Sequence, residues 1–80
     1  MTKTPKKQAR DPRRAVLKKL GEKVRERRHQ RGLTQEQLAD ALDLSVAYVS
    51  LIERGGRNPP FTTVVAIAGA LKTSPRELCD

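Results

Sequence analysis

Residues Thr34–Glu53, TQEQLADALDLSVAYVSLIE, contain two short segments with apolar residues at helical spacing, and each segment has its own start signal. Thr34, followed three residues later by Gln37, forms the pattern of a capping box. In this pattern each side chain accepts a hydrogen bond from the backbone amide of the other residue. Ser45 is the start signal of the second segment. Because so few residues separate the two segments, we expect two helices that meet at a steep angle.

The second segment has a distinct outer side when it is drawn as a helix of 100° per residue. Val49 and Ile52 then face inward, and the outward residues are small or neutral at the start and cationic at the end. These outward residues are Val46, Ala47, Ser50 and Arg54. The second helix of a helix-turn-helix can enter the DNA major groove, and small side chains permit a close approach to the bases. The spacing alone leaves a plain solvent-exposed helix of a four- or five-helix bundle equally open.

A longer run, LGEKVRERRHQRGLTQEQLADALDLSVAYVSLIERGGRNPP, resembles the phage-repressor-like (Xre/Cro-type) helix-turn-helix regulators of bacteria and phages. The matching motifs are GLTQEQLA, the LSxxYVSxIE block and the RNPP that follows, in the order and at the spacing of that family. The resemblance covers about residues 17–78. It implies an all-α, five-helix repressor-like domain over residues 11–80, with its helix-turn-helix at residues 34–53. It also implies sequence-specific binding of double-stranded DNA in transcriptional control.

The resemblance implies roles for residues on either side of the second helix. Gln35 would bond a phosphate, or a base beside the second helix, here called the reading helix because it would contact the bases. Arg57 and Asn58, in the loop after the Gly55-Gly56 helix end, would contact the sugar-phosphate backbone. The family has a structural ion pair between Glu53 and an arginine of the first helix, for which Arg25 is the candidate in this sequence. If that pair is buried, losing one partner would destabilise the fold by about 3 kcal/mol or more.

The outer side of the second helix departs from its relatives at Val46, where many carry Arg, Lys or Gln. Valine has no hydrogen-bond donor, so it cannot form a bidentate bond with guanine or adenine. Val46 and Ala47 can pack on a thymine methyl group, which leaves Ser50 as the main polar reader between Gln35 and Arg54. We therefore predict sparse direct readout, with the site chosen partly by DNA shape.

Tyr48 lies at the rim of the same helix, and two interpretations of it stay open. The ring can pack on the protein while the hydroxyl reaches a phosphate, or the whole side chain can belong to the core. Either interpretation is compatible with its position in the helical projection.

Positive charge is concentrated at the start of the chain, which carries a net charge of +8. Residues 1–31 hold thirteen of the 17 Lys and Arg but only three of the 9 Asp and Glu. This asymmetry favours a polyanionic partner over a merely solubilising basic surface. Residues 1–10 lack apolar periodicity and are predicted to be a flexible basic arm. Lys6 and Lys7 would order there on a phosphate backbone or in a minor groove, and a solubilising tail is the alternative.

The remaining helices are predicted from start signals and apolar stripes. Asp11-Pro12 and Ser74-Pro75 each pair an N-cap residue with proline at the first helical position. The stripe expected to be buried in the first helix is Val16, Leu17, Leu20 and Val24. The stripe expected in the fourth helix is Phe61, Val64, Val65, Ala68 and Leu71, with Ile67 alongside.

Several classes of function are disfavoured by what the sequence lacks. No arrangement of nucleophile, base and orienting residue is present, and neither a glycine-rich phosphate loop nor a metal-spaced cluster accompanies His29. We therefore expect no catalytic residues, metal, cofactor or small-molecule ligand. The single Cys79 excludes an internal disulfide and fits a reducing compartment. No apolar run reaches the ~20 residues of a membrane span, so a cytoplasmic, nucleoid-associated protein is expected.

A single reading helix contacts few base pairs, so a homodimer on a palindromic site is expected. Its candidate interfaces are the last turn around Leu78 and the apolar remainder of the fourth helix. Two other functions stay open. The chain could be an antitoxin-like or accessory DNA-binding partner of another protein, or a non-specific binder of nucleic acid or anionic surfaces through its basic first half.

Overall fold

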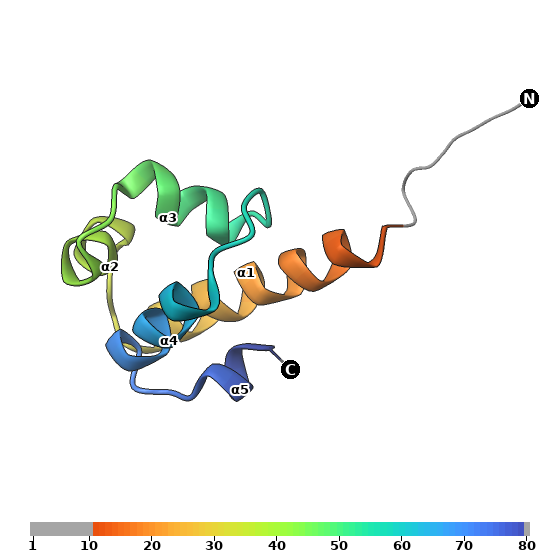
Figure 1. The fold of residues 1–80 in the computed structure, drawn as a ribbon. Coiled ribbons are helices and arrows are strands. Elements are labelled where there is room, and N and C mark those ends of the chain that lie inside the picture. Colours follow the sequence, from red (N-terminus) through yellow and green to blue (C-terminus); the bar gives the residue numbers. More distant parts are fainter. Residues whose placement is uncertain (1–10, 80) are drawn as a thin grey trace, which may run out of the picture.

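The computed structural model describes residues 11–79, which form five α-helices (Figure 1). They are α1 (Pro12–Gln30), α2 (Gln35–Leu42), α3 (Val46–Glu53), α4 (Phe61–Ala70) and α5 (Pro75–Cys79). The five-helix all-α fold predicted from the sequence is confirmed. The predicted basic arm, residues 1–10, lies outside the described residues. None of the described helices combines the length and apolar character that crossing a membrane requires.

Local hydrogen bonds place the starts of the helices where the sequence predicted them. The capping box is complete, because the Gln37 amide donates to Thr34 Oγ1 at 3.0 Å and the Thr34 amide donates to Gln37 Oε1 at 2.9 Å. The other side chains that accept a bond from the first turn are Asp11, Ser45 and Ser74. Each bond satisfies a backbone donor that the helix itself leaves unpaired.

The turn of the helix-turn-helix depends on a left-handed backbone at Asp43, where φ is 57° and ψ is 43°. Aspartate tolerates this region better than most residues. The amides of Asp43 and Leu44 still bond to carbonyls of α2, so the chain reverses without unpaired donors at these two positions. α3 then begins directly after Ser45.

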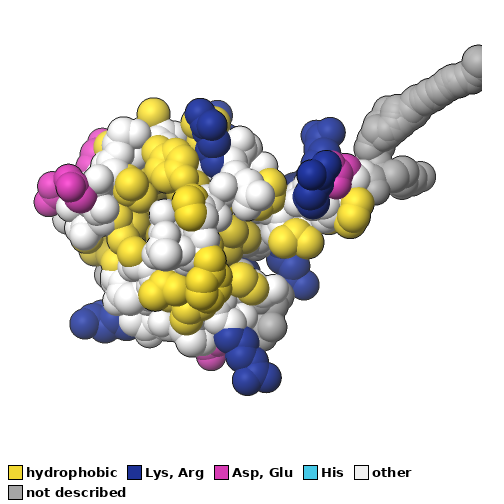
Figure 2. All heavy atoms as spheres, in the orientation of Figure 1, with side chains coloured by type: hydrophobic (Ala, Val, Ile, Leu, Met, Phe, Trp, Pro, Cys, Tyr) yellow, Lys and Arg dark blue, Asp and Glu magenta, His cyan; other side chains and the backbone are white. Residues whose placement is uncertain are grey.

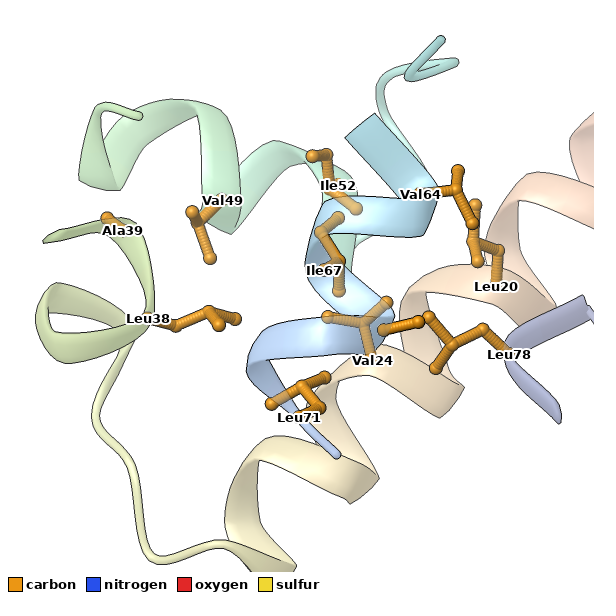
Figure 3. Close-up of a cluster of buried hydrophobic side chains, with 11 residues drawn as sticks. Leu20, Val24, Leu38, Ala39, Val49, Ile52, Val64, Ile67, Leu71 and Leu78 are labelled. Carbon is orange, nitrogen blue, oxygen red and sulfur yellow. The ribbon is translucent and has the colours of Figure 1, made fainter. Parts of the chain in front are cut away.

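All five helices contribute to one core, whose side chains point toward one another in Figure 3. Its largest fully buried members are Val24, Leu38, Val49, Ile52, Ile67, Leu71 and Leu78. The prediction that Val49 and Ile52 face inward is confirmed, with 2% and 1% of their surfaces exposed. α3 therefore has a fixed rotation about its own axis, and its opposite side faces outward.

Three residues expected in the core are exposed instead. Val16 is 61% exposed because the first turns of α1 project beyond the other helices (Figure 1). Phe61 is 68% exposed at the first position of α4, and Val65 is 44% exposed at the edge of the buried stripe. The stripe that α4 buries contains Val64, Ile67 and Ala68. The predictions for Val16, Phe61 and Val65 were wrong because periodicity identifies a face but not the extent of its neighbours.

α1 and α3 approach each other closely at two glycines. A Cβ atom at Gly21 would lie 2.5 Å from the Glu53 carbonyl oxygen, and one at Gly55 would lie 2.8 Å from the Lys18 Cα. Gly55 also has a φ of +77°, which L-residues rarely adopt. Gly21 is unfavourable for helix formation, and this close crossing explains its presence.

Candidate nucleic-acid interface

The outer side of α3 is open to solvent. Val46 is 39% exposed, and Ala47 and Arg54 are also exposed. Ser50 is partly exposed one turn after Val46. The described residues leave Val46, Ala47 and Arg54 exposed and cover Ser50 only in part, so a surface of small residues ending in a cation is available to a partner.

The loop between α3 and α4 adds polar groups at the end of α3. Arg57 and Asn58 are exposed, whereas the following Pro59 is buried and anchors the loop to the domain. The Gly56 amide donates to the Leu51 carbonyl at 2.8 Å, which closes the end of α3. The sequence-predicted pair Arg57 and Asn58 is therefore presented on an anchored loop that adjoins the reading helix.

Tyr48 is partly buried against the edge of the core. The structure thus supports a packing contribution from its ring.

A buried hydrogen-bond network fixes α3 to α1 and α2. Arg28 donates to both carboxylate oxygens of Glu53, through Nε to Oε2 at 2.6 Å and through Nη2 to Oε1 at 3.0 Å. Arg28 Nη1 also donates to the Leu33 carbonyl at 2.8 Å. Gln35 Nε2 donates to Glu53 Oε1 at 3.0 Å. One carboxylate therefore holds the first residue of α2, the end of α3 and the second half of α1 in register.

The arginine predicted to pair with Glu53 was the wrong one. Glu53 does form a buried ion pair, but its partner is Arg28, and Arg25 is exposed. Arg28 continues the buried positions Leu20 and Val24 at intervals of four residues, so it lies on the inner side of α1. That spacing was present in the sequence and is the signal that identifies Arg28.

The network also determines the charge state of Glu53. Burial by itself raises the pKa of this carboxyl, but the hydrogen bonds from Arg28 and Gln35 outweigh burial and hold the pKa below its ordinary value. Glu53 is thus an anion at neutral pH, and it orients the Gln35 side chain through an accepted bond. Gln35 is positioned at the start of α2 before any partner arrives.

Charge is unevenly distributed around the domain, as Figure 2 shows for one face. Acidic side chains gather over α2, where Glu36 and Asp40 are exposed, together with Asp43 in the turn that follows. Lys and Arg side chains lie along the projecting part of α1. The exposed side of α2 is therefore acidic, whereas the projecting part of α1 is basic.

Comparison with known proteins places the chain in a family. Residues 24–78, more than half of the chain, match the family model HTH_3, described as helix-turn-helix. The immunity repressor protein of Bacillus phage phi105 is 44% identical over 52 residues, which are 65% of this chain and 36% of the repressor. The chain thus spans about a third of the length of that relative.

Two solved structures have the same fold. The restriction-modification controller protein C.AhdI of Aeromonas hydrophila is 44% identical, with a TM-score of 0.76 over 80% of this chain and 97% of that one. SinR, a master regulator for biofilm formation solved in complex with DNA, is 26% identical, with a TM-score of 0.72 over 76% of this chain and 98% of that one. The chain belongs to the HTH_3 family of helix-turn-helix proteins.

Proposed function

We propose that the protein is a transcriptional regulator that binds double-stranded DNA sequence-specifically, with α3 in the major groove. The observation that carries this proposal is the geometry of α3. Its inner side is fixed by the core and by the network around Glu53, and its outer side presents the exposed Val46 and Ala47 and the partly exposed Ser50. A helix that enters the groove needs both a fixed rotation and a slim outer side. SinR, a relative of the same fold, was solved with DNA bound.

Base readout in this proposal is mostly apolar. Val46 and Ala47 contact thymine methyl groups, and Ser50 supplies the main hydrogen bond to a base edge. DNA shape contributes the rest of the specificity, since so few donors reach the groove centre. The groups proposed to contact phosphates or the groove edges are Gln35, Tyr48, Arg54, Arg57 and Asn58, together with Lys6 and Lys7 of the predicted basic arm, residues 1–10.

We further propose a homodimer on two half-sites about 34 Å apart. The two candidate interfaces are the last turn around Leu78 and the apolar remainder of α4. Leu78 is 0% exposed, so it offers no apolar contact to a second copy. Phe61 and Val65 are exposed large apolar side chains one turn apart on α4. A face of this kind, lying beside the α3–α4 loop, would join two copies while both reading helices remain free. We also propose that the protein acts in the cytoplasm in association with the nucleoid, because its proposed ligand is double-stranded DNA.

Selection of bound duplexes from a random pool tests the reading surface. We expect enrichment of a site whose central positions favour A·T pairs. Val46→Gln should shift the preference at one position of each half-site, because glutamine can bond adenine. Lys72→Gln, at an exposed position in the turn after α4, is the surface control. Enrichment that ignores Val46→Gln, or no enrichment at all, would contradict the proposal.

Sedimentation with and without the selected duplex tests the dimer. Phe61→Ser should weaken self-association and binding to the full site, while binding to an isolated half-site is retained. Val16→Ser removes a similarly exposed apolar side chain from α1, 61% against 68% exposed, and serves as the control. A wild-type protein that remains monomeric on the full site would contradict the proposed homodimer but not the proposed reading surface.

A further inference from the structure

A cleft of about 390 Å³ lies between the first turns of α1 and the end of α3. Its lining residues are Asp11, Arg14, Ala15, Lys18, Arg54 and Gly55. Two helices that are distant in the sequence thus bring three cations to one hollow. The HTH_3 match begins at residue 24, so the side of the cleft formed by α1 lies outside the matched motif.

The position of this cleft relative to α3 is fixed by backbone packing. The Gly55 Cα lies so close to α1 that an added Cβ would be 2.8 Å from the Lys18 Cα and 3.1 Å from the Lys18 amide nitrogen. Arg54 directly precedes this contact, and Arg14 lies one turn before Lys18 on the same side of α1. Arg14 and Lys18 are therefore carried on a helix, and Arg54 on the C-cap of α3, where its amide donates to the Ser50 carbonyl at 3.1 Å.

The charges in the cleft are available to an anion. Among residues 11–79, Arg14, Lys18 and Arg54 form no ion pair. The one acidic lining residue, Asp11, is engaged by Arg13. Arg13 donates through Nε to Oδ1 at 3.0 Å and through Nη2 to Oδ2 at 2.8 Å, and its amide also donates to Oδ1 at 3.0 Å. The cleft thus presents three cations that form no ion pair among the described residues, beside one carboxylate that is held by Arg13.

We propose that this cleft binds a backbone phosphate of the DNA whose major groove receives α3. It would thus add a DNA contact outside the helix-turn-helix. The inference rests on the proposed function, because its ligand is the same duplex. Arg54 connects the two surfaces, since it is the exposed C-cap residue of α3 and also lines the cleft. A phosphate contact of this kind adds affinity and orientation without sequence preference.

The same cations have a second effect that the test must separate. They lie near the carboxyl end of α3, where the helix dipole favours positive charge. If this were their only role, removing them would lower thermal stability and leave the phosphate contacts of the complex unchanged.

The experiment compares the double variant Arg14→Gln/Lys18→Gln with the wild-type protein on the selected duplex and on a random duplex at several salt concentrations. Arg54 is kept because it belongs to the proposed reading surface. We expect severalfold weaker binding to both duplexes, by the same factor. The slope of log K against log salt should become shallower by about 0.9 for each phosphate that the variant no longer neutralises.

The matched control is Lys72→Gln/Arg76→Gln, which removes the same two charges. Both residues are exposed, and they lie around α5, away from α3 in Figure 1. Its salt slope should equal that of the wild-type protein. If the cleft variant has the slope of the control, with or without a lower Tm, the phosphate site is overturned while the proposed function stands. If the wild-type protein selects no duplex, both fail together.

Discussion

The two halves of α1 have opposite surroundings within one continuous helix. From Leu20 to Arg28, its inner side is covered by other helices, and Val24 is 1% exposed. From Pro12 to Lys19, every side chain except the half-buried Leu17 is exposed, Val16 at 61%, although the backbone at Lys18 still lies against Gly55. The apolar spacing is the same in both halves, so helical periodicity alone does not distinguish a wall of the core from a free extension.

The difference between the halves corresponds to a division of roles. The packed half holds Arg28 and Gly21, which set the position of α3 through an ion pair and a close backbone crossing. The projecting half carries Arg14 and Lys18, which are exposed beside the end of α3. Substitutions in the packed half should therefore change stability, and substitutions in the projecting half should change binding.

The largest difference is expected between two arginines of α1. Arg28→Met leaves the Glu53 carboxylate buried without its counter-charge, which should reduce the free energy of unfolding by about 3–5 kcal/mol. Arg25→Met, three residues away on the exposed side, should change it by about 0.5 kcal/mol or less. Urea denaturation of both variants measures the difference. Equal losses of unfolding free energy would show that Arg28, with its buried ion pair, is no more important for stability than the exposed Arg25.

The same valine-to-alanine change in each half isolates packing. Val24→Ala removes two methyl groups from the core and should cost about 2 kcal/mol, from reduced burial and the cavity left behind. Val16→Ala should lie within about 0.5 kcal/mol of the wild-type protein, since the side chain is mostly in solvent. Thermal unfolding of both variants is the measurement. A loss at Val16 that approaches the loss at Val24 would mean that the projecting half is packed in solution.

The crossing of α1 and α3 can be tested at glycine. Gly21→Ala improves helix propensity but places a methyl group against the Glu53 carbonyl, so we expect a net loss of about 1–2 kcal/mol. Gly69→Ala in α4 meets no atom within 4 Å and should gain about 0.4–1 kcal/mol. Chemical denaturation of the two variants should thus give opposite signs. A stabilised Gly21→Ala would indicate a looser crossing.

The smallest expected effect is a dependence on acid. The pKa of Glu53 is lowered in the folded state from its ordinary value of 4.5, so the network contributes its full stability above that pH. As pH falls below 4.5, the unfolded chain takes up a proton first, and this contribution is lost at no more than about 1.4 kcal/mol per pH unit. Denaturation between pH 3 and 7 should show a shallower slope for Glu53→Gln than for the wild-type protein. Identical slopes would show that Glu53 does not contribute to the loss of stability in acid.

Much of the candidate interface was predictable because its parts are local. The outward residues Val46, Ala47 and Arg54 follow from the helical rotation that Val49 and Ile52 impose. The predicted partner of Glu53 was wrong, since Arg25 and Arg28 both lie near the end of one basic helix and only the four-residue spacing from Val24 separates them. Contacts of these residues with DNA stay predictions, which duplex selection and the salt titrations test.

What the amino-acid sequence determined alone was the set of helices and the rotation of α3. The caps at Asp11, Thr34 and Ser45 join groups two or three residues apart, so they form wherever the rest of the chain lies. The tertiary structure decided which apolar residues are covered, which arginine is buried, and that Arg14 and Lys18 meet Arg54 at one cleft. Those outcomes depend on where the helices cross and on how far each helix extends beyond its neighbours. The pattern of residues along a single helix contains neither piece of information.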